Sequence, residues 1–304
     1  MSKLLEISSL NFSYNSDINS LLKTYNLEKL QQAPEDHHRD STNGVFGVNL
    51  SIEKGDFFSL IGRNGSGKST LVKLISGLLQ GYQGNIFFKG KNLKLYNGKE
   101  ISKILSFLPQ SFFPEFSGMG GITVFDFLLL GRYPYKKNID YLIKENDIKS
   151  VEFCMNLIDI VDFKGRYFHE LSGGEKQKVY ITLSLVQLNA MSDLSEKLLI
   201  IDEPLTYLDI NHQFEMFSLL KTLNVQKKLT ILIVTHDLSL AMKFTEKSIL
   251  LSKGFVVANG ITRDIITESN LQKYFNVNST ILKDNKEYSI NFHASLKSGS
   301  KSTT

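Results

Sequence analysis

The chain has little of several features that define other classes of protein. Cys154 is the only cysteine among the 304 residues, which excludes a disulfide or a cysteine-based metal site within one chain. Residues 151–158 around it have the apolar spacing of a helix, a setting that favours a packed side chain over a reactive thiol.

Long apolar runs are also missing. Those at 127–130 and 198–201 are far shorter than the ~20 residues that a membrane-spanning helix requires, so if a membrane is involved, another chain crosses it. Residues 1–6 lack the basic region and apolar core of a secretory signal. We therefore expect no such signal and take the cytosol as the location.

An excess of charge is the third feature that the chain lacks. The formal net charge is only +4, with no single basic arm, which gives little support to nucleic-acid binding. The hydrophobic content of 42% is ample for a core, in one large domain or two small ones. We expect a soluble globular protein without a nucleic-acid partner.

A phosphate-binding loop is the most informative stretch present. Residues 62–70 match G-x-x-x-x-G-K-[ST], between a predicted buried strand at 57–61 and a predicted helix at 71–78. The flanking strand and helix disfavour the alternative of a glycine-rich turn that matches by chance. Backbone N–H groups at the helix's positive end can surround a phosphate. The residues expected to bind nucleotide here are Gly62, Arg63, Asn64, Gly65, Ser66, Gly67, Lys68, Ser69 and Thr70.

Within this loop two side chains have distinct expected roles. Lys68 is expected to reach the β- and γ-phosphates of a nucleotide, and the Ser69 hydroxyl to ligate Mg²⁺.

Two further apolar stretches lead into polar side chains. Residues 198–201 run directly into Asp202 and Glu203, the pattern of a buried parallel strand that delivers acids to a site. Asp202 suits Mg²⁺, and Glu203 suits a general base that activates water. Residues 230–234 form another predicted buried strand that leads to His236, and the end of this strand should lie beside Asp202 and Glu203. Alone, such acids can serve solubility and such a histidine can be structural; the phosphate loop favours the functional interpretation.

A second glycine-containing helix start lies at residues 171–175, Leu-Ser-Gly-Gly-Glu, before a predicted helix over 176–188. It can bind phosphate but has no lysine of its own. The alternative is an ordinary helix cap, for which Ser and Gly are common.

The first predicted strand, at residues 4–14, ends in Tyr14, a candidate for stacking on a nucleotide base rather than for the core. The polar, turn-rich residues 15–43 that follow are predicted to be an insertion. The pair His37 and His38 within it fits a solvated loop better than a metal site, because adjacent histidines cannot complete one alone.

Taken in order, these motifs resemble the ATPase subunit of ABC transporters over about residues 3–290. Residues 171–175, just upstream of the acidic strand end, match the signature that separates this family from other phosphate-loop NTPases. The resemblance implies an α/β P-loop NTPase fold of the ABC ATPase type, with a RecA-like core, an antiparallel β subdomain and an inserted helical subdomain at about 111–188. It predicts one domain over 1–292, including the insertion, and a disordered tail at 293–304.

The resemblance also implies roles for single residues. Tyr14 would stack on the adenine of ATP, and His236 would contact the γ-phosphate. Gln110 would sense Mg²⁺ and the attacking water and link to the helical subdomain. The implied catalytic residues are Glu203, His236 and Gln110; the implied Mg²⁺ residues are Ser69, Gln110 and Asp202.

A second copy of the chain is implied as well. Ser172, Gly173 and Gly174 would cap the γ-phosphate of ATP held by the other subunit, and Asp209 would lie at the dimer interface. A homodimer would therefore close head to tail around two ATP molecules, with half of each site on each chain.

Residues 129–134, 203–213 and 264–267 resemble the importer branch for ferric siderophores, haem and cobalamin. This implies an ATP-hydrolysing subunit, peripheral on the inner face of the membrane, that energises uptake of an iron chelate through a separate permease. A substrate-binding protein would be an indirect partner. Residues 111–135 are predicted to form the permease groove. The alternatives are a cobalamin or other metal-complex importer, a soluble non-transport ABC ATPase, and a silent nucleotide-binding regulator, against which intact Glu203 and His236 argue.

Several positions depart from the family pattern. Leu205 replaces a small hydroxyl residue, and residues 15–43 and 189–197 are longer than is usual. Lys176 and Lys178 replace arginines, and lysine keeps the charge but loses the bidentate fork, so partner contacts there should be weaker.

Overall fold

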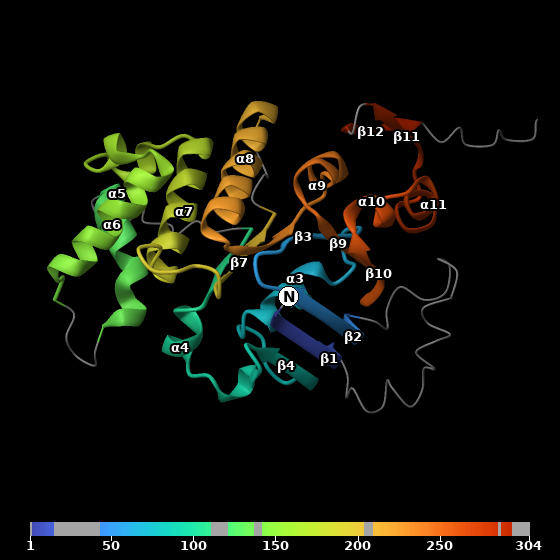
Figure 1. Ribbon diagram of the computed structural model, residues 1–304, viewed down its shortest axis with the longest axis horizontal. Helices are drawn as coiled ribbons and strands as arrows, with labels where there is room; N and C mark the ends of the chain where they lie inside the picture. The colour runs from blue at the N-terminus through green and yellow to red at the C-terminus, as the bar shows by residue number, and fades with distance from the viewer. Residues whose placement is uncertain are drawn as a thin grey trace, which may run out of the picture.

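The structure, a computed structural model, describes residues 2–14, 43–110, 121–136, 142–203, 209–284 and 287–293. Its described strands form a four-stranded sheet of order β2-β1-β4-β5, a six-stranded sheet of order β10-β9-β3-β8-β7-β6, and the pair β11-β12. Helices α5, α6 and α7 stand on one side of the molecule, away from the antiparallel sheet (Figure 1). The α/β fold predicted from the sequence is confirmed, while the boundaries of its subdomains stay a prediction.

The four-stranded antiparallel sheet is built on β1 (Lys3–Ser13), which pairs with β2 (Gly44–Glu53) and β4 (Gln83–Phe88). The short β5 (Lys91–Asn92) adds to β4. Leu5, Ile7 and Ile86 on these strands are buried in the same apolar cluster as α3 (Lys68–Ile75). The antiparallel sheet and the central sheet therefore enclose the phosphate-loop helix between them.

The central sheet has β3 (Phe57–Ile61), β8 (Thr230–Val234), β7 (Leu198–Asp202) and β6 (Leu105–Leu108) in parallel. On its other side β9 (Lys247–Ser252) runs parallel to β3, and β10 (Phe255–Ile261) pairs antiparallel with β9. The strands β3, β7 and β8 have five residues each, and all of these residues are buried. Their nearly continuous apolar sequences are typical of strands covered on both faces, and the polar exception in β3, Ser59, is hydrogen-bonded to Ser248.

Successive residues of these strands enter two different cores, as the two-residue period of a strand demands. Ile231 and Ile233 pack in the cluster that contains α8 (Ile210–Lys227), whereas Leu232 and Val234 pack with α3. The sheet is thus held between α3 on one face and α8 on the other.

The described residues between 121 and 188, here called the helical segment, contain six helical elements. They are α5 (Val124–Leu129), η2 (Leu130–Tyr135), α6 (Glu145–Ile158), η3 (Val161–Phe163), η4 (Phe168–Glu170) and α7 (Gly173–Leu188). Phe127, Cys154 and Tyr180 are buried in one cluster with residues of the central sheet. The packed role predicted for Cys154 is confirmed, and burial raises the pKa of its thiol to about 12.

The remaining elements connect or follow the sheets. They are η1 (Leu93–Leu95), α4 (Gly98–Ser102), α9 (Leu238–Phe244), α10 (Thr262–Ile265), α11 (Glu268–Asn270), the π-helical η5 (Leu271–Phe275), β11 (Asn278–Asp284) and β12 (Glu287–His293). Within the described parts, no helix combines the length and apolarity needed to cross a bilayer. The predicted insertion, apart from Asn43, and residues 294–304 of the predicted tail lie outside the described residues.

Candidate functional site

The site is assembled by the order of the parallel strands. β3, β8, β7 and β6 are consecutive neighbours, so their carboxyl ends meet at one edge of the sheet. The phosphate loop follows β3, His236 follows β8, Glu203 follows β7, and Gln110 follows β6. Residues that lie far apart in the sequence therefore converge, and the predicted proximity of His236 to the acidic strand end is confirmed.

The phosphate loop depends on backbone shapes that side chains would prevent. Gly62 has φ of 152°, and a Cβ there would stand 2.2 Å from the carbonyl oxygen of Leu251. Gly67, which precedes the first turn of α3, has φ of 101°. Only glycine adopts such conformations without strain. The loop can therefore turn its N–H groups toward an anion at the start of α3.

Lys68 is the buried cation of this loop. It is only 5% exposed, and its ammonium donates to the carbonyl oxygens of Gly62, at 2.9 Å, and Arg63, at 3.1 Å. Burial lowers the pKa of Lys68, while the carboxylates of Glu203 and Asp202 oppose the shift. Because neutral carbonyl groups bind an ammonium less strongly than an anion does, Lys68 is ready to turn to a phosphate oxygen.

Asp202 and Ser69 form a set of oxygen atoms beside the loop. Asp202 is 3% exposed, and its Oδ1 has no hydrogen-bond partner in the described structure. Burial raises the pKa of Asp202, and a hydrogen bond with the Ser69 side chain acts in the opposite direction. Mg²⁺ prefers oxygen ligands, and a buried carboxylate oxygen without a partner next to a hydroxyl supplies them. Asp202 and Ser69 therefore fit that cation.

Glu203 is held from two sides. Gln110 Nε2 donates to Oε2 at 2.7 Å, and His236 Nε2 makes a hydrogen bond with Oε1. The glutamate also has φ of 49°, a left-handed conformation that is uncommon for a residue with a side chain. Strain of this kind is found at functional sites. The arrangement fixes a carboxylate at the edge where the phosphate loop and Asp202 lie.

Tyr14 lies beside the phosphate loop despite the long insertion. Its backbone N–H donates to the carbonyl oxygen of Asn43 at 2.9 Å, so the chain leaves and re-enters the sheet at the same point. The Thr70 hydroxyl approaches the Tyr14 hydroxyl at 3.5 Å, and the tyrosine is 47% exposed. Tyr14 therefore lies next to Thr70 of the phosphate loop with an exposed side chain, and its role against the adenine stays a prediction.

The start of α7 is a complete helix cap. The hydroxyl of Ser172 accepts from the N–H of Glu175, and the Glu175 carboxylate accepts from the N–H of Ser172 at 2.8 Å. Arg166 donates to the same carboxylate at 2.7 Å and, with the Ser172 bond, lowers the pKa of Glu175 to about 2. Sequence reasoning missed Arg166, because no local pattern connects it to Glu175.

The signature residues are not brought to the phosphate loop of their own chain. α7 packs on α5, α6, η2 and β6, and in the sheet β6 is separated from β3 by β7 and β8. Three strand spacings amount to about 14 Å. The helix that Ser172, Gly173 and Gly174 begin is therefore anchored on β6, three strands away from the strand that leads to Lys68.

Asp209 caps α8 and positions a histidine that the sequence reasoning did not single out. The Asp209 carboxylate accepts from the backbone N–H of His212 at 2.9 Å and lies 2.8 Å from its Nδ1. A Cβ on Gly174 would stand 2.6 Å from Cδ2 of this ring. The starts of α7 and α8 are thus in direct contact.

Comparison with known proteins decides the family. The family model described as "ABC transporter" matches residues 45–206. The chain belongs to the ABC transporter family. Among relatives of this ABC protein, the iron(3+)-hydroxamate import ATP-binding protein FhuC of Bacillus subtilis is 34% identical over 237 residues, covering 78% of this chain and 84% of that protein. The ferric enterobactin transport ATP-binding protein FepC of Escherichia coli is 32% identical, covering 78% and 83%.

A solved structure supports the fold of the ABC protein. The ADP conformation of MJ1267, an ATP-binding cassette of an ABC transporter, superposes with a TM-score of 0.68 at 20% identity, covering 88% of this chain and 95% of that one. The resemblance stated from the sequence is confirmed: this ABC protein is the ATP-binding, ATP-hydrolysing component of a transporter.

Proposed function

We propose that this ATPase energises the import of a ferric chelate, a ferric siderophore or haem, through a separate membrane permease. The support comes from relatives whose names specify import of iron(3+)-hydroxamate and transport of ferric enterobactin. The ATPase activity at the centre of the proposal rests on one observation: the Glu203 carboxylate is held by Gln110 and His236 at the edge of the sheet where Lys68 and Asp202 stand.

In the proposed mechanism, Glu203 accepts a proton from the attacking water. Its two oxygens are oriented by Gln110 and His236, so the carboxylate does not have to be ordered during the reaction. Lys68 turns from the loop carbonyls to the phosphate oxygens and offsets the charge that develops there. His236 contacts the γ-phosphate from the end of β8.

Ser69 and Asp202 would hold Mg²⁺, and Gln110 would approach it from the end of β6. When bound, the cation neutralises phosphate charge and orients the β- and γ-phosphate oxygens. The unpartnered Oδ1 of Asp202 supports this assignment. The residues proposed to hold the nucleotide remain those of 62–70, with Tyr14 against the adenine.

The proposed active form is a head-to-tail homodimer. Ser172, Gly173 and Gly174 begin a helix whose N–H groups can bind an anion, yet this helix packs on β6, which lies about three strand spacings from β3 and the phosphate loop of the same chain. A second copy would supply the phosphate, with Asp209 at the interface. Beside it Ile210 is 74% exposed, an apolar side chain that such an interface would bury.

We place the permease contact at residues 121–135, within the predicted groove 111–135, whose residues 111–120 lie outside the described structure. Leu130 and Tyr133 on η2 are 55% and 57% exposed, while Arg132 between them is buried. A firmly anchored turn with exposed apolar side chains suits a partner protein. The ATPase would then sit on the inner face of the membrane, and a substrate-binding protein would act on the other side.

Two measurements on Glu203→Gln test the proposal. Purified wild-type protein should hydrolyse ATP, and the variant should lose at least about 100-fold in kcat while still binding ATP, since only the base is removed. Cells that depend on the variant should fail to take up iron from a ferric siderophore or from haem. Unchanged uptake of both, with ATPase activity lost, would refute iron import and leave the ATPase assignment standing.

A further inference from the structure

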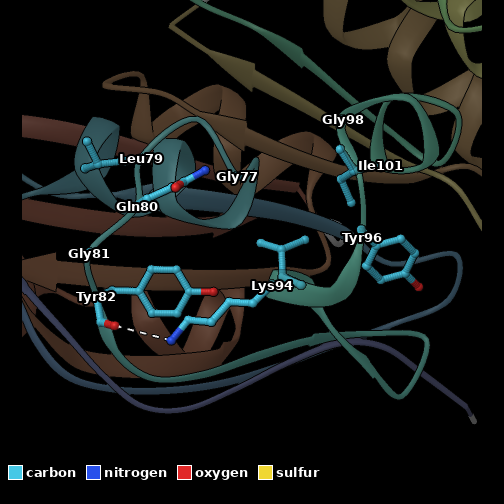
Figure 2. A pocket seen from close by; sticks show the side chains of 10 residues that line it. Gly77, Leu79, Gln80, Gly81, Tyr82, Lys94, Tyr96, Gly98 and Ile101 are labelled. Carbon is cyan, nitrogen blue, oxygen red and sulfur yellow. Dashed lines mark hydrogen bonds between the residues drawn. The ribbon is translucent and has the colours of Figure 1, made fainter.

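A cavity of about 300 Å³ lies away from the nucleotide site, between the end of α3 and the segment that carries η1 and α4. Leu79, Leu93 and Ile101 give it an apolar lining, and Tyr82 and Lys94 contribute polar groups (Figure 2). The phosphate loop lies at the start of α3, and the cavity adjoins the other end of this helix. A helix of eight residues is about 12 Å long, which separates the cavity from the loop.

The hydroxyl of Tyr82 has no hydrogen-bond partner in the described structure, although the residue is only 8% exposed. Figure 2 shows its ring among the lining side chains, with the hydroxyl turned toward the middle of the group. A buried hydroxyl without a partner costs free energy, and a bound acceptor removes that cost. Burial raises the pKa of Tyr82, so the hydroxyl keeps its proton at neutral pH and acts as a donor.

Lys94 supplies a positive charge beside this donor. Its ammonium lies 4.5 Å from the centre of the Tyr82 ring. Its hydrogen bond to the Tyr82 carbonyl oxygen is long, at 3.5 Å, and therefore weak. It forms no ion pair with any carboxylate that the structure describes. The ammonium is therefore available to an anion at the mouth of the cavity.

The surrounding segment concentrates the charge of the protein. Residues 89–103 contain five lysines and one acid, Glu100, a net charge of +4, which equals the formal charge of the whole chain. Lys89 is paired with Glu196, and Lys91 lies 3.6 Å from Glu100 as well as against the ring of Tyr96, while Lys99 lies against the ring of Tyr133. The segment that forms one wall of the cavity is thus positively charged, which favours negatively charged ligands beside Lys94, the lysine that lines the cavity.

We propose that this cavity binds a small amphipathic anion, in which a phosphate or carboxylate is joined to an apolar body. The anionic group accepts from Tyr82 and pairs with Lys94, and the apolar body lies against Leu79, Leu93 and Ile101. Two sources share this chemistry: a free organic anion, or the phosphate region of an anionic phospholipid. The proposal rests on the cavity alone and does not depend on the substrate of the importer.

The test measures binding of hexyl phosphate to the full chain by saturation-transfer NMR, without nucleotide. Tyr82→Phe and Lys94→Met should each weaken binding about fivefold to tenfold, because each removes one interaction with a charged group. Tyr167→Phe and Lys149→Met are matched controls on exposed residues elsewhere and should bind as wild type does. Tyr82→Phe keeps the ring and removes only an unpartnered hydroxyl, so it should fold normally.

Vesicles distinguish the two sources. The protein is sedimented with phosphatidylcholine vesicles that contain phosphatidylglycerol and, separately, with pure phosphatidylcholine vesicles. Binding to the first and not to the second, with this binding lost in Tyr82→Phe, supports the site and assigns it to a phospholipid. Hexyl phosphate binding without vesicle binding supports the site and assigns it to a free anion. The proposal is overturned if wild-type protein does not bind hexyl phosphate at millimolar concentration, or if all four variants bind it as wild type does.

Discussion

Gln110 Nε2 donates a hydrogen bond to Glu203 Oε2 across 2.7 Å, so the residue after β6 orients the carboxylate after β7. Replacing Gln110 by Ala leaves the phosphate loop intact but frees one side of this carboxylate. We expect kcat for ATP hydrolysis to fall about 10- to 100-fold with little change in KM. Steady-state kinetics measure both. A large rise in KM with unchanged kcat would show that Gln110 serves binding and not orientation.

Asp202 gives a prediction for stability. Burial raises its pKa above the ordinary value of 3.8, so the folded state holds this proton more tightly than the unfolded state does. Its favourable contribution is present below pH 3.8 and is lost as pH rises through the folded pKa. Asp202→Asn, which cannot ionise, should therefore be more stable than wild type at neutral pH, by about 1 kcal/mol, with the difference vanishing in acid.

Denaturant unfolding without nucleotide or Mg²⁺, from pH 4 to 8, checks this. Asp162→Asn, a change at an exposed acid, should show no such pH-dependent gain. ATP hydrolysis should nevertheless be lost in Asp202→Asn, since the carboxylate proposed for Mg²⁺ is gone. An Asn variant that is less stable than wild type at neutral pH would contradict the argument.

How much of the site the sequence could predict depends on how local each constraint is. The phosphate loop was predictable because Gly62 to Thr70 are contiguous and their backbone shapes follow from residue type. The strand ends at Asp202 and His236 were predictable from aliphatic runs that only a strand covered on both faces explains. The direct bonds from Gln110 and His236 to Glu203 required the strand order, which no single segment encodes.

Arg132 shows where such prediction ends. In the sequence it belongs to a Gly-Arg-Tyr-Pro turn, and no local pattern there indicates that the cation is buried. In the structure it is 3% exposed, because hydrogen-bond acceptors from the start of α6 and the end of α7 converge on its guanidinium. Those acceptors are up to 57 residues away in sequence, so only the assembled helical segment reveals that the charge is structural.

Gly174 and His212 give a prediction about coupling between α7 and α8. A Cβ at Gly174 would meet His212 Cδ2 at 2.6 Å, and Asp209 holds that ring in place through Nδ1. Gly174→Ala should therefore displace the start of α7 and lower kcat at least about tenfold. Adding His212→Ala makes room for the methyl group and should restore most of the activity. If the double variant is as inactive as Gly174→Ala, the glycine is required for another reason, such as close approach to the partner's nucleotide.

The buried cation Arg132 should be among the most sensitive positions for stability. Its guanidinium donates to Asp147 at 3.0 Å, to Ser150 at 3.2 Å, to the carbonyl oxygen of Val186 at 3.2 Å and to Asn189 at 3.1 Å. Arg132→Met keeps the apolar volume but leaves these groups without their donor. We expect the free energy of unfolding to fall by about 3 kcal/mol, because the remaining pair of Lys136 and Asp147 only partly compensates.

The pH dependence separates this ionic effect from packing. Burial raises the pKa of Asp147, but hydrogen bonds from Lys136, from the backbone of Lys144 and from Arg132 outweigh it and lower the pKa below 3.8. An acid with a lowered pKa stabilises the fold above its unfolded pKa, and this stabilisation is lost as pH falls through the folded value. The deficit of Arg132→Met, measured by urea unfolding, should therefore be largest at neutral pH and shrink toward pH 3. A deficit that stays constant over this range would mean that Arg132 acts through packing and its neutral acceptors alone.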